Sequence, residues 1–403
     1  MSNGRCLCCG ALAVETLLDL GAQPPSNLFL QSPDDSYGTH PLVFGACNTC
    51  GLAQLRSPMP VQMVRCRHSW LHYNEPEGHL DDVAEKLTAL VNLPQPRIRG
   101  LSYKDTSLLQ RLSERGWADA GNVGPCASEE NLGIERLQAL ITPDWAKDQI
   151  QTHGQADILL ARHVLEHAHN PQAFIKACSL LVRPGGWMVF EVPGCESLFR
   201  RHEHCFIWEE HTLYFTVRSF QAILHAARLE VFALYEYPAS QESSLLVFAR
   251  NSPEHAQISL LTQSMSSDER VAELELLRAF AASFTKRAAG MHNFLQTAMN
   301  RRPAVMFGAG HLGIKAINFY GLRPYIAAVI DDFPEKQGRF LPGSGLPVVG
   351  SDYLATAKPG ICLLGLNPER QAQVMAAHAG YAEDGGQWHS IFSCTHAAWE
   401  SRL

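Results

Sequence analysis

The chain has 403 residues, a length that predicts two or three domains rather than one core. Its 46% hydrophobic and 18% charged content is typical of a globular protein. The net charge of −7, without any basic run, argues against a general nucleic-acid binder. No apolar stretch approaches the roughly 20 residues that cross a bilayer, and the first residues have no apolar signal core. We therefore expect a cytoplasmic protein that does not span a membrane, whose cysteines are thiols or metal ligands.

The N-terminal part differs in character from the rest of the chain. The first sixty-odd residues are rich in Cys, Pro and Gly and show no long helical period, which predicts a small loop-rich module that needs a staple. From about Asp81 the stretch HLDDVAEKLTALV has apolar residues at helical spacing. The module is therefore expected to end near residue 70.

Strand and helix patterns then alternate along the chain. Residues 158–161 predict a strand, and NPQAFIKACSLLV predicts a helix with Asn170 as its N-cap and Pro171 at its first position. The stretch RPGG predicts a turn, and WMVFEV predicts the next strand. This alternation is typical of a parallel sheet with helices on its faces.

The C-terminal third repeats this pattern after a helical segment. Residues 267–299 carry apolar positions three or four apart, which predicts one long amphipathic helix. A second strand, turn and helix follow in AVMFGAGHLGIKAINFYGL, and IAAVID is the next strand. We expect an α/β protein with a zinc-binding module at 1–70, a Rossmann-like domain at 71–250, a helical connector at 251–300 and a second Rossmann-like domain at 301–403.

Two C-x-x-C knuckles lie within the first fifty residues. Cys6 pairs with Cys9, and Cys47 pairs with Cys50, so the sequence provides the four thiolates of a tetrahedral structural zinc site. A glycine follows each knuckle, which suits a tight turn around a metal. Unmetallated thiols or a redox C-x-x-C are the alternatives, and two knuckles favour zinc. With all four positions filled by protein, the metal has no predicted catalytic role.

The stretch WEEHTLYF, residues 208–215, sets two carboxylates and a histidine between aromatic residues. Histidine suits a general base because its pKa lies near working pH, and a neighbouring carboxylate can orient the ring. The alternative is a helix-start cluster with a satisfied histidine, and the residue types alone do not separate the two.

Three stretches in one order resemble the nucleotide-sugar C-methyltransferase family. They are HPLVFGACNTCGLAQL, ILLARHVLEHAHNPQAFIKACSLLVRPGGWMVFEVP and DDFPEKQGRFLPGSGLPVV. The resemblance implies a zinc module, a class I methyltransferase domain and a C-terminal sugar-nucleotide domain. In that family a base removes a proton beside a keto group of a deoxysugar, and the enolate accepts the methyl of S-adenosylmethionine.

The resemblance also implies roles for individual residues. It makes His211 the base with Glu210 beside it, and Trp208 stands where the family usually has tyrosine. Tyr73 is expected to reach the sugar pocket, although packing against the first helix is the alternative. The implied sites are catalytic His211, Glu210, Tyr73 and Tyr214; cofactor-binding Gly100, Ser102, Asp105, Thr106, Arg162 and His163; and substrate-binding Trp208, Gly308, Gly310, Gly313, Asp331 and Lys336.

The cofactor stretch departs from the family pattern of an acid followed by two spaced glycines. In GLSYKDT, Gly100 stands where the acid belongs, Ser102 and Thr106 replace the glycines, and Lys104 adds a cation. No acid directly follows the next expected strand, in GNVGPCASEENLG, to hold the ribose. S-adenosylmethionine is therefore expected to bind through altered contacts or to have been lost.

The second glycine-rich turn has its own alternatives. Gly308, Gly310 and Gly313 form G-x-G-x-x-G after a strand, and Asp331 ends the next strand, as in NAD-binding folds. The family instead implies a sugar-nucleotide site in which the glycines serve close packing or a phosphate. We expect the second interpretation.

The leading hypothesis is a C-methyltransferase that acts on a nucleotide-linked keto sugar or a related activated carbonyl compound. The alternatives are a donor-independent isomerase, epimerase or dehydratase on the same scaffold, and a non-catalytic protein of that architecture. The expected partners are a small-molecule substrate and at most a second copy of the chain, with no nucleic acid and no membrane.

Overall fold

The structure is a computed structural model that describes residues 4–65, 68, 75–125, 133–251, 265–298 and 302–402. The chain divides into two compact units. Unit 1 contains residues 1–16, 45–196 and 210–274, and unit 2 contains residues 17–44, 197–209 and 275–403. Strands β1 (Val14–Gln23) and β2 (His40–Cys47) each contain a point where the chain passes from one unit to the other.

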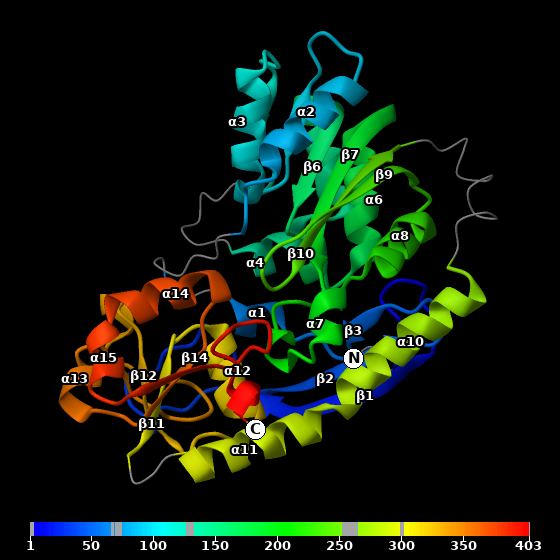
Figure 1. The fold of residues 1–403 in the computed structure, drawn as a ribbon. Coiled ribbons are helices and arrows are strands. Elements are labelled where there is room, and N and C mark those ends of the chain that lie inside the picture. The colour runs from blue at the N-terminus through cyan, green and yellow to red at the C-terminus, as the bar shows by residue number, and fades with distance from the viewer. Residues whose placement is uncertain are drawn as a thin grey trace. The chain divides into compact units, whose positions relative to one another are not determined.

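Unit 1 is built on a six-stranded sheet with the order β5-β4-β6-β7-β10-β9. Figure 1 labels its strands β6, β7, β10 and β9. Strands β4 to β7 pair in parallel, and β10 pairs antiparallel with both β7 and β9. The strands are β4 (Ile98–Gly100), β5 (Ala120–Asn122), β6 (Ala156–Arg162), β7 (Val182–Gly194), β9 (Glu230–Tyr237) and β10 (Ser243–Arg250).

Helices cover both faces of this sheet, because alternate residues of each strand point to opposite sides. Ile158 and Leu160 of β6 belong to a buried cluster with α2 and α3, whereas Leu159 and Ala161 belong to another with α4, α5, α6 and α8. The helices are α1 (Val61–Val64), α2 (Leu80–Leu90), α3 (Thr106–Glu114), α4 (Ile134–Leu140), α5 (Pro143–His153), α6 (Pro171–Leu181) and α8 (Val217–Ala226).

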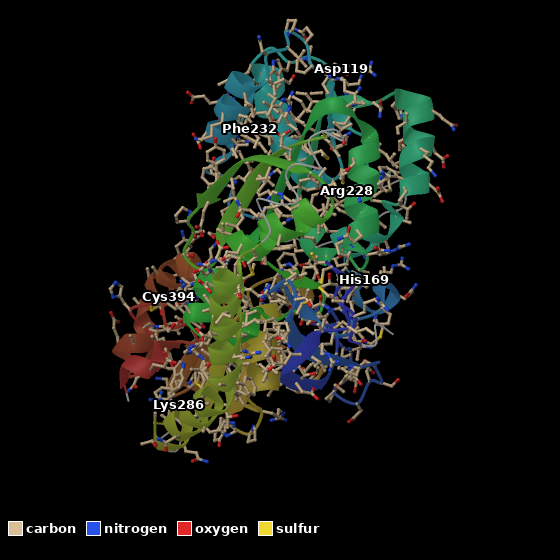
Figure 2. The ribbon with its side chains drawn as sticks, turned by 90° about the vertical axis from the view of Figure 1, so that its right-hand side faces the viewer. Asp119, His169, Arg228, Phe232, Lys286 and Cys394 are labelled. Carbon is tan, nitrogen blue, oxygen red and sulfur yellow. The ribbon has the colours of Figure 1, made fainter. Side chains whose placement is uncertain are left out.

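Several sequence predictions for unit 1 are confirmed. The helix after residue 80 is α2, the strand at 158–161 lies within β6, and α6 begins after Asn170, whose side chain accepts a hydrogen bond from the amide of Ala173. The chain leaves α8 for β9 at Arg228, which has a φ of 63° (Figure 2).

The prediction of a turn at RPGG is wrong. Residues 183–186 lie inside the long strand β7, where they bulge between the pairs Ala156–Val182 and Ile158–Trp187. Gly185 has a φ of 74°, so the glycines let the strand bulge without ending it.

Unit 2 contains a five-stranded parallel sheet with the order β13-β12-β11-β14-β15. Its buried core is apolar and includes Val305, Ile330 and Leu364. The elements are β11 (Ala304–Phe307), α12 (His311–Phe319), β12 (Ile326–Ile330), β13 (Val348–Val349), α13 (Tyr353–Ala357), β14 (Ile361–Leu364), α14 (Pro368–Ala377), α15 (Ala379–Glu383) and β15 (Gln387–Ser390).

The single long helix predicted over residues 267–299 is two helices, α10 (Ser267–Ala282) and α11 (Phe284–Ala298). They are interrupted at Ser283, whose hydroxyl donates to the carbonyl of Phe280 at 2.7 Å. A serine hydroxyl that bonds a preceding carbonyl competes with the helical ladder, which explains the break. No helix of the described residues is long and apolar enough to cross a membrane.

Short elements complete the fold. Strand β3 (Ala53–Leu55) pairs antiparallel with β8 (Leu213–Tyr214) in unit 1. The remaining elements are α7 (Glu196–Arg200) and the 3-10 helices η1 (Tyr103–Asp105), η2 (Leu165–His167), η3 (His204–Phe206), η4 (Pro334–Lys336) and η5 (Trp399–Arg402).

Candidate functional site

The four predicted zinc ligands come together. Cys6, Cys9, Cys47 and Cys50 offer sulfur atoms that all lie within 4.8 Å of one another. The Cys6–Cys50 and Cys9–Cys47 sulfur pairs are each 3.6 Å apart. Zinc–sulfur bonds of about 2.3 Å in a tetrahedron require sulfur separations of about 3.8 Å, so the cluster fits zinc.

The two knuckles have the same backbone geometry. The amide of Cys8 donates to the sulfur of Cys6, and the amide of Thr49 donates to the sulfur of Cys47. Gly10 and Gly51 have φ angles of 73° and 74°, a conformation that disfavours residues with a side chain. These bonds help to orient the sulfurs of Cys6 and Cys47.

His211 lies two residues before β8, next to the loop that follows β6 and contains η2. The following strand β8 pairs with β3, and Thr212 bonds to the chain around η2: its amide donates to the carbonyl of Glu166 at 2.8 Å and its hydroxyl to that of Ala168 at 2.8 Å. These contacts hold His211 against η2. The Tyr214 ring lies near His211, with the two ring centroids 6.4 Å apart.

The sequence interpretation did not include two residues that adjoin His211, Glu166 and His167. The side chains of Glu166, His167 and His211 offer ligand atoms within 4.8 Å of one another. The rings of the two histidines are perpendicular, with centroids 4.7 Å apart. The signal that could have found this pair is the EH dipeptide at a strand end, in VLEH.

Burial lowers the pKa of His211, although the carboxylates of Glu166 and Glu75 partly offset this effect. Burial lowers the pKa of His167 further, with a contribution from the His211 ring. Both rings are therefore neutral near pH 7, and neutral imidazole is the form that can accept a proton or bind a metal.

The carboxyl group of Glu210 hydrogen-bonds to that of Glu135 on α4. Both residues are buried, and burial raises the pKa of Glu135. Two carboxyl groups can share a hydrogen bond only when one of them holds a proton. Glu166 lies beside His211, and its carboxylate raises the pKa of that ring. Glu166 therefore has the place beside the histidine that the sequence interpretation gave to Glu210.

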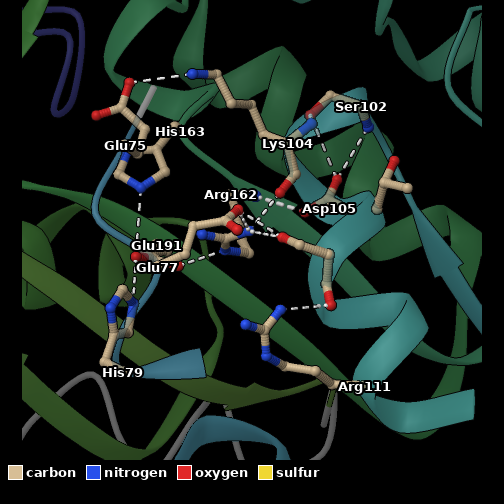
Figure 3. Close-up of polar contacts among 12 residues, drawn as sticks. Glu75, Glu77, His79, Ser102, Lys104, Asp105, Arg111, Arg162, His163 and Glu191 are labelled. Atoms are coloured by element: carbon tan, nitrogen blue, oxygen red, sulfur yellow. Dashed lines mark hydrogen bonds and ion pairs between the residues drawn. The ribbon is translucent and has the colours of Figure 1, made fainter. Parts of the chain in front are cut away.

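The predicted cofactor loop follows β4 and is braced by its own acid. Asp105 is fully buried, and its carboxylate accepts hydrogen bonds from the amides of Leu101 at 2.8 Å, Ser102 at 2.9 Å and Arg162 at 3.0 Å (Figure 3). A Cβ at Gly100 would lie 2.7 Å from the Cβ of Asp105, whose side chain is held by these hydrogen bonds, so packing favours glycine there. The hydroxyl of Ser102 caps the amide of Lys104.

Ion pairs surround this loop (Figure 3). Lys104 Nζ lies 3.1 Å from Glu75, and Arg162 Nε donates to the buried Glu191 carboxylate at 2.5 Å. Glu191 also contacts His79 at 2.8 Å and His163 at 3.3 Å. Glu191, His79 and Glu75 were all missed, because the segment before α2 meets β7 and the loop after β4 only in the folded chain.

The charge of His163 is fixed by this network. Burial alone would lower the pKa of His163, but Glu191 and Glu75 raise it to about 10. The same contacts hold the pKa of Glu191 well below its usual range despite burial. His163 is therefore a cation near pH 7, and Arg162 and His163 are engaged by carboxylates of the protein.

The polar residue at the end of β5 is Asn122. Its amide donates to the hydroxyl of Thr106 at 3.2 Å, and its side chain is exposed. An amide can bond to vicinal hydroxyls, so Asn122 fits the position at which an acid was sought in the sequence. Tyr73 lies outside the described residues.

In unit 2 the glycine-rich turn joins β11 to α12. Gly308 has a φ of 108°, and a Cβ on Gly313 would lie 2.4 Å from the carbonyl oxygen of Gly308, so both glycines are required by the fold. Nothing lies within 4 Å of a Cβ on Gly310. Asp331 braces the turn: it accepts from the amide of Ala309 at 3.0 Å and from Lys336 Nζ at 2.7 Å.

Trp208 and Glu209 also lie in unit 2, next to α12. The Trp208 ring stacks on His311 with centroids 4.2 Å apart. Glu209 forms a fully buried ion pair with Lys315 and accepts a hydrogen bond from the amide of Ser26. The two carboxylates of WEEH therefore have different partners, Lys315 for Glu209 and Glu135 for Glu210.

Three protein families match the chain in succession. Residues 6–64 match a zinc binding domain, residues 101–234 a methyltransferase domain, and residues 242–392 the C-methyltransferase C-terminal domain. This is the order expected from the sequence.

The extent of similarity to individual proteins differs widely. The C-methyltransferase NovU of Streptomyces niveus is 23% identical over 95% of this chain and 94% of its own length. The ubiquinone biosynthesis O-methyltransferase of Pectobacterium atrosepticum is 35% identical, but over only 15% of this chain and 29% of its own length. The solved magnesium protoporphyrin IX methyltransferase of Synechocystis, with bound SAH, covers 47% of this chain and 93% of its own at 16% identity and a TM-score of 0.31.

Proposed function

We propose a function from the premise that this chain is a SAM-dependent methyltransferase with the three-domain composition of the C-methyltransferases. In this proposal it methylates a carbon beside a keto group of a nucleotide-linked deoxysugar. The NovU similarity over nearly the full length of both chains supports C-methylation. The observation that carries the proposal is the pair of neutral histidines, the buried His167 and the half-buried His211, beside the Glu166 carboxylate.

In this proposal His211 removes the proton from the substrate carbon. Its neutral ring accepts the proton, and the Glu166 carboxylate stabilises the imidazolium that results. Tyr214, which is 3% exposed, packs near the His211 ring.

S-adenosylmethionine supplies the electrophilic methyl group when bound. The carboxyl ends of β4 and β5 present Asn122 and Thr106 to its ribose, while Gly100 keeps the backbone close to Asn122. Because the Leu101 and Ser102 amides already bond to Asp105, the loop offers fewer free amides than a glycine-rich loop. We therefore expect the donor to bind more weakly than in relatives with glycines.

Unit 2 supplies the proposed sugar-nucleotide residues. The open space at Gly310 precedes the first turn of α12, where backbone amides suit a phosphate. Both Asp331 oxygens bond within the unit, to Ala309 and Lys336 through one and to Phe333 through the other, so this acid is poorly placed for the ribose of NAD. These contacts argue against NAD as the ligand of this turn, and we propose the sugar nucleotide in its place.

The test is hydrogen exchange in deuterated water with a candidate nucleotide-linked keto sugar. The wild-type protein should exchange the proton beside the carbonyl, and addition of S-adenosylmethionine should give a product heavier by one methylene. His211→Asn should lose about a hundred- to ten-thousand-fold in exchange rate, the usual contribution of a general base. The exposed His153 on α5 provides the control, since His153→Asn should behave as wild type. Equal exchange by wild type and His211→Asn would exclude the proposed base.

A further inference from the structure

We propose that Glu166, His167 and His211 form a second metal site, which binds a divalent zinc ion distinct from the one held by the cysteines. We further propose that zinc bound there suppresses the enzyme. The first statement is independent of the proposed function, and the second rests on it.

The geometry of the three side chains suits this ligand set. Imidazole nitrogens and carboxylate oxygens are common zinc ligands, and the three ligand atoms lie within 4.8 Å of one another. Glu166 Oε1 is 3.9 Å from His167 Nε2. A tetrahedral ion with bonds of about 2.1 Å needs ligand atoms about 3.4 Å apart, so modest rotation of the side chains closes the site.

A hydrogen bond to its second ring nitrogen orients His167 in the way that is common for metal-binding histidines. Nδ1 of His167 lies 2.9 Å from the carbonyl oxygen of Glu210, which can only accept a hydrogen bond. Nδ1 therefore carries the hydrogen, and Nε2 has a lone pair directed toward Glu166. Metal-binding histidines typically donate their second nitrogen to such a carbonyl.

The backbone beneath the ligands is held as well. Thr212, which follows His211, bonds to the carbonyls of Glu166 and Ala168 through its amide and hydroxyl. Two ligands from η2 and one from the segment before β8 are thereby fixed to each other. A divalent ion would not need to order either segment on binding.

The triad differs from the cysteine cluster in having three ligands. Four thiolates fill a tetrahedral zinc site, whereas three protein ligands leave one position for water or another small ligand. Glu166 Oε1 also lies 3.6 Å from His163 Nδ1, so the His163 side chain competes with the metal for this oxygen. We therefore expect weaker binding here than at the cysteines.

Zinc binding and the proposed reaction exclude each other. The lone pair of His211 that would accept the substrate proton is the one that would bind the metal. Occupancy of the triad therefore removes the base without changing the fold, and chelation restores it.

Calorimetric titration of the full chain with zinc chloride tests the site. The protein is first treated with a mild chelator until metal analysis shows one zinc per chain. We expect a second equivalent to bind to the wild type, and Glu166→Gln, His167→Asn and His211→Asn each to weaken it at least tenfold, with His153→Asn unchanged. Binding of only one equivalent in total, or a second equivalent that the three variants retain, would overturn the proposal.

A second measurement on the wild type does not depend on the folding of the variants. Cobalt(II) added to the chelated protein should give visible bands without the intense sulfur charge-transfer absorption of a thiolate site. Sulfur-type absorption only, or none, counts against the site. In the exchange assay, zinc should inhibit reversibly with the affinity measured by calorimetry. A protein that binds the second zinc but exchanges no proton with or without it would refute the proposed function alone.

Discussion

Nδ1 of His167 lies 2.9 Å from the carbonyl oxygen of Glu210, although the two residues are 43 positions apart in the sequence. This hydrogen bond joins the loop after β6 to the segment before β8. It fixes one tautomer of His167 and sets that ring perpendicular to His211. The predictions below follow from this arrangement and from the charges around it.

The pH dependence of proton exchange should reflect the lowered pKa of His211. A base must be neutral to accept a proton, and burial keeps this ring neutral below its ordinary value of 6.5. Exchange should therefore persist as pH falls through 6.5 and disappear at a lower pH. The rate of deuterium incorporation between pH 5 and 8 measures this, and an acid limb centred above pH 7 would contradict it.

The carboxyl pair of Glu135 and Glu210 should contribute to stability when protonated. The raised pKa of Glu135 means that its contribution is fully present below 4.5 and is lost as pH rises through the folded-state pKa. Glu135→Gln should remove this pH dependence because an amide donates without titrating. Glu135→Ala should cost about 1–3 kcal/mol by leaving Glu210 without this partner. Urea unfolding of the three proteins at several pH values measures both effects; a wild type and Glu135→Gln with the same pH dependence would argue against the shared proton.

Lys104 should oppose binding of S-adenosylmethionine, whose sulfonium is positive. Lys104→Ser removes the cation and leaves the Glu75 carboxylate, so the affinity should improve about fivefold, equivalent to ~1 kcal/mol. Calorimetric titration with the free donor measures this. Lys147→Ser is the matched control, because Lys147 forms an exposed pair with Asp144 on α5. Unchanged or weaker binding by Lys104→Ser would show that the lysine does not disfavour the donor.

The cysteine cluster should hold one tightly bound zinc that unit 1 needs for folding. Cys47→Ser removes a fully buried ligand and should lower the yield of folded protein, because a structural metal is coupled to folding. Cys178→Ser is a control, since Cys178 is a buried cysteine outside the cluster. Metal analysis and circular dichroism follow the outcome; protein purified without chelator that contains no zinc would refute the assignment.

The buried pair of Glu209 and Lys315 should stabilise unit 2 only while both partners are present. Both side chains are 0% exposed. Lys315→Met should destabilise the unit by about 3–5 kcal/mol, because it leaves a buried carboxylate without its cation. Addition of Glu209→Gln should recover much of this loss. Thermal unfolding of the single and double variants tests the coupling, and additive losses would rule it out.

The sequence by itself determined the features that depend on neighbours along the chain. Helical spacing predicted α2, the Asn170-Pro171 pair predicted the start of α6, and two C-x-x-C knuckles predicted the cysteine set. In each case the physical cause is a period, a cap or a ligand spacing within a few residues. The histidine of WEEH was singled out by the acidic and aromatic residues beside it, and its role as the base came from the family resemblance.

The tertiary structure alone decided which distant residues meet. Glu166 and His167 reach His211, and Glu135 reaches Glu210, because η2, α4 and the segment before β8 pack together. Packing likewise let β7 continue through a bulge at residues 183–186. Such contacts depend on strand order and on the burial of whole helices and strands. Neither of these can be predicted from the pattern of a few neighbouring residues. The sequence thus identified one histidine of the candidate site, His211. Only the folded chain set its partners and its charge, and placed beside it His167 with a fixed tautomer.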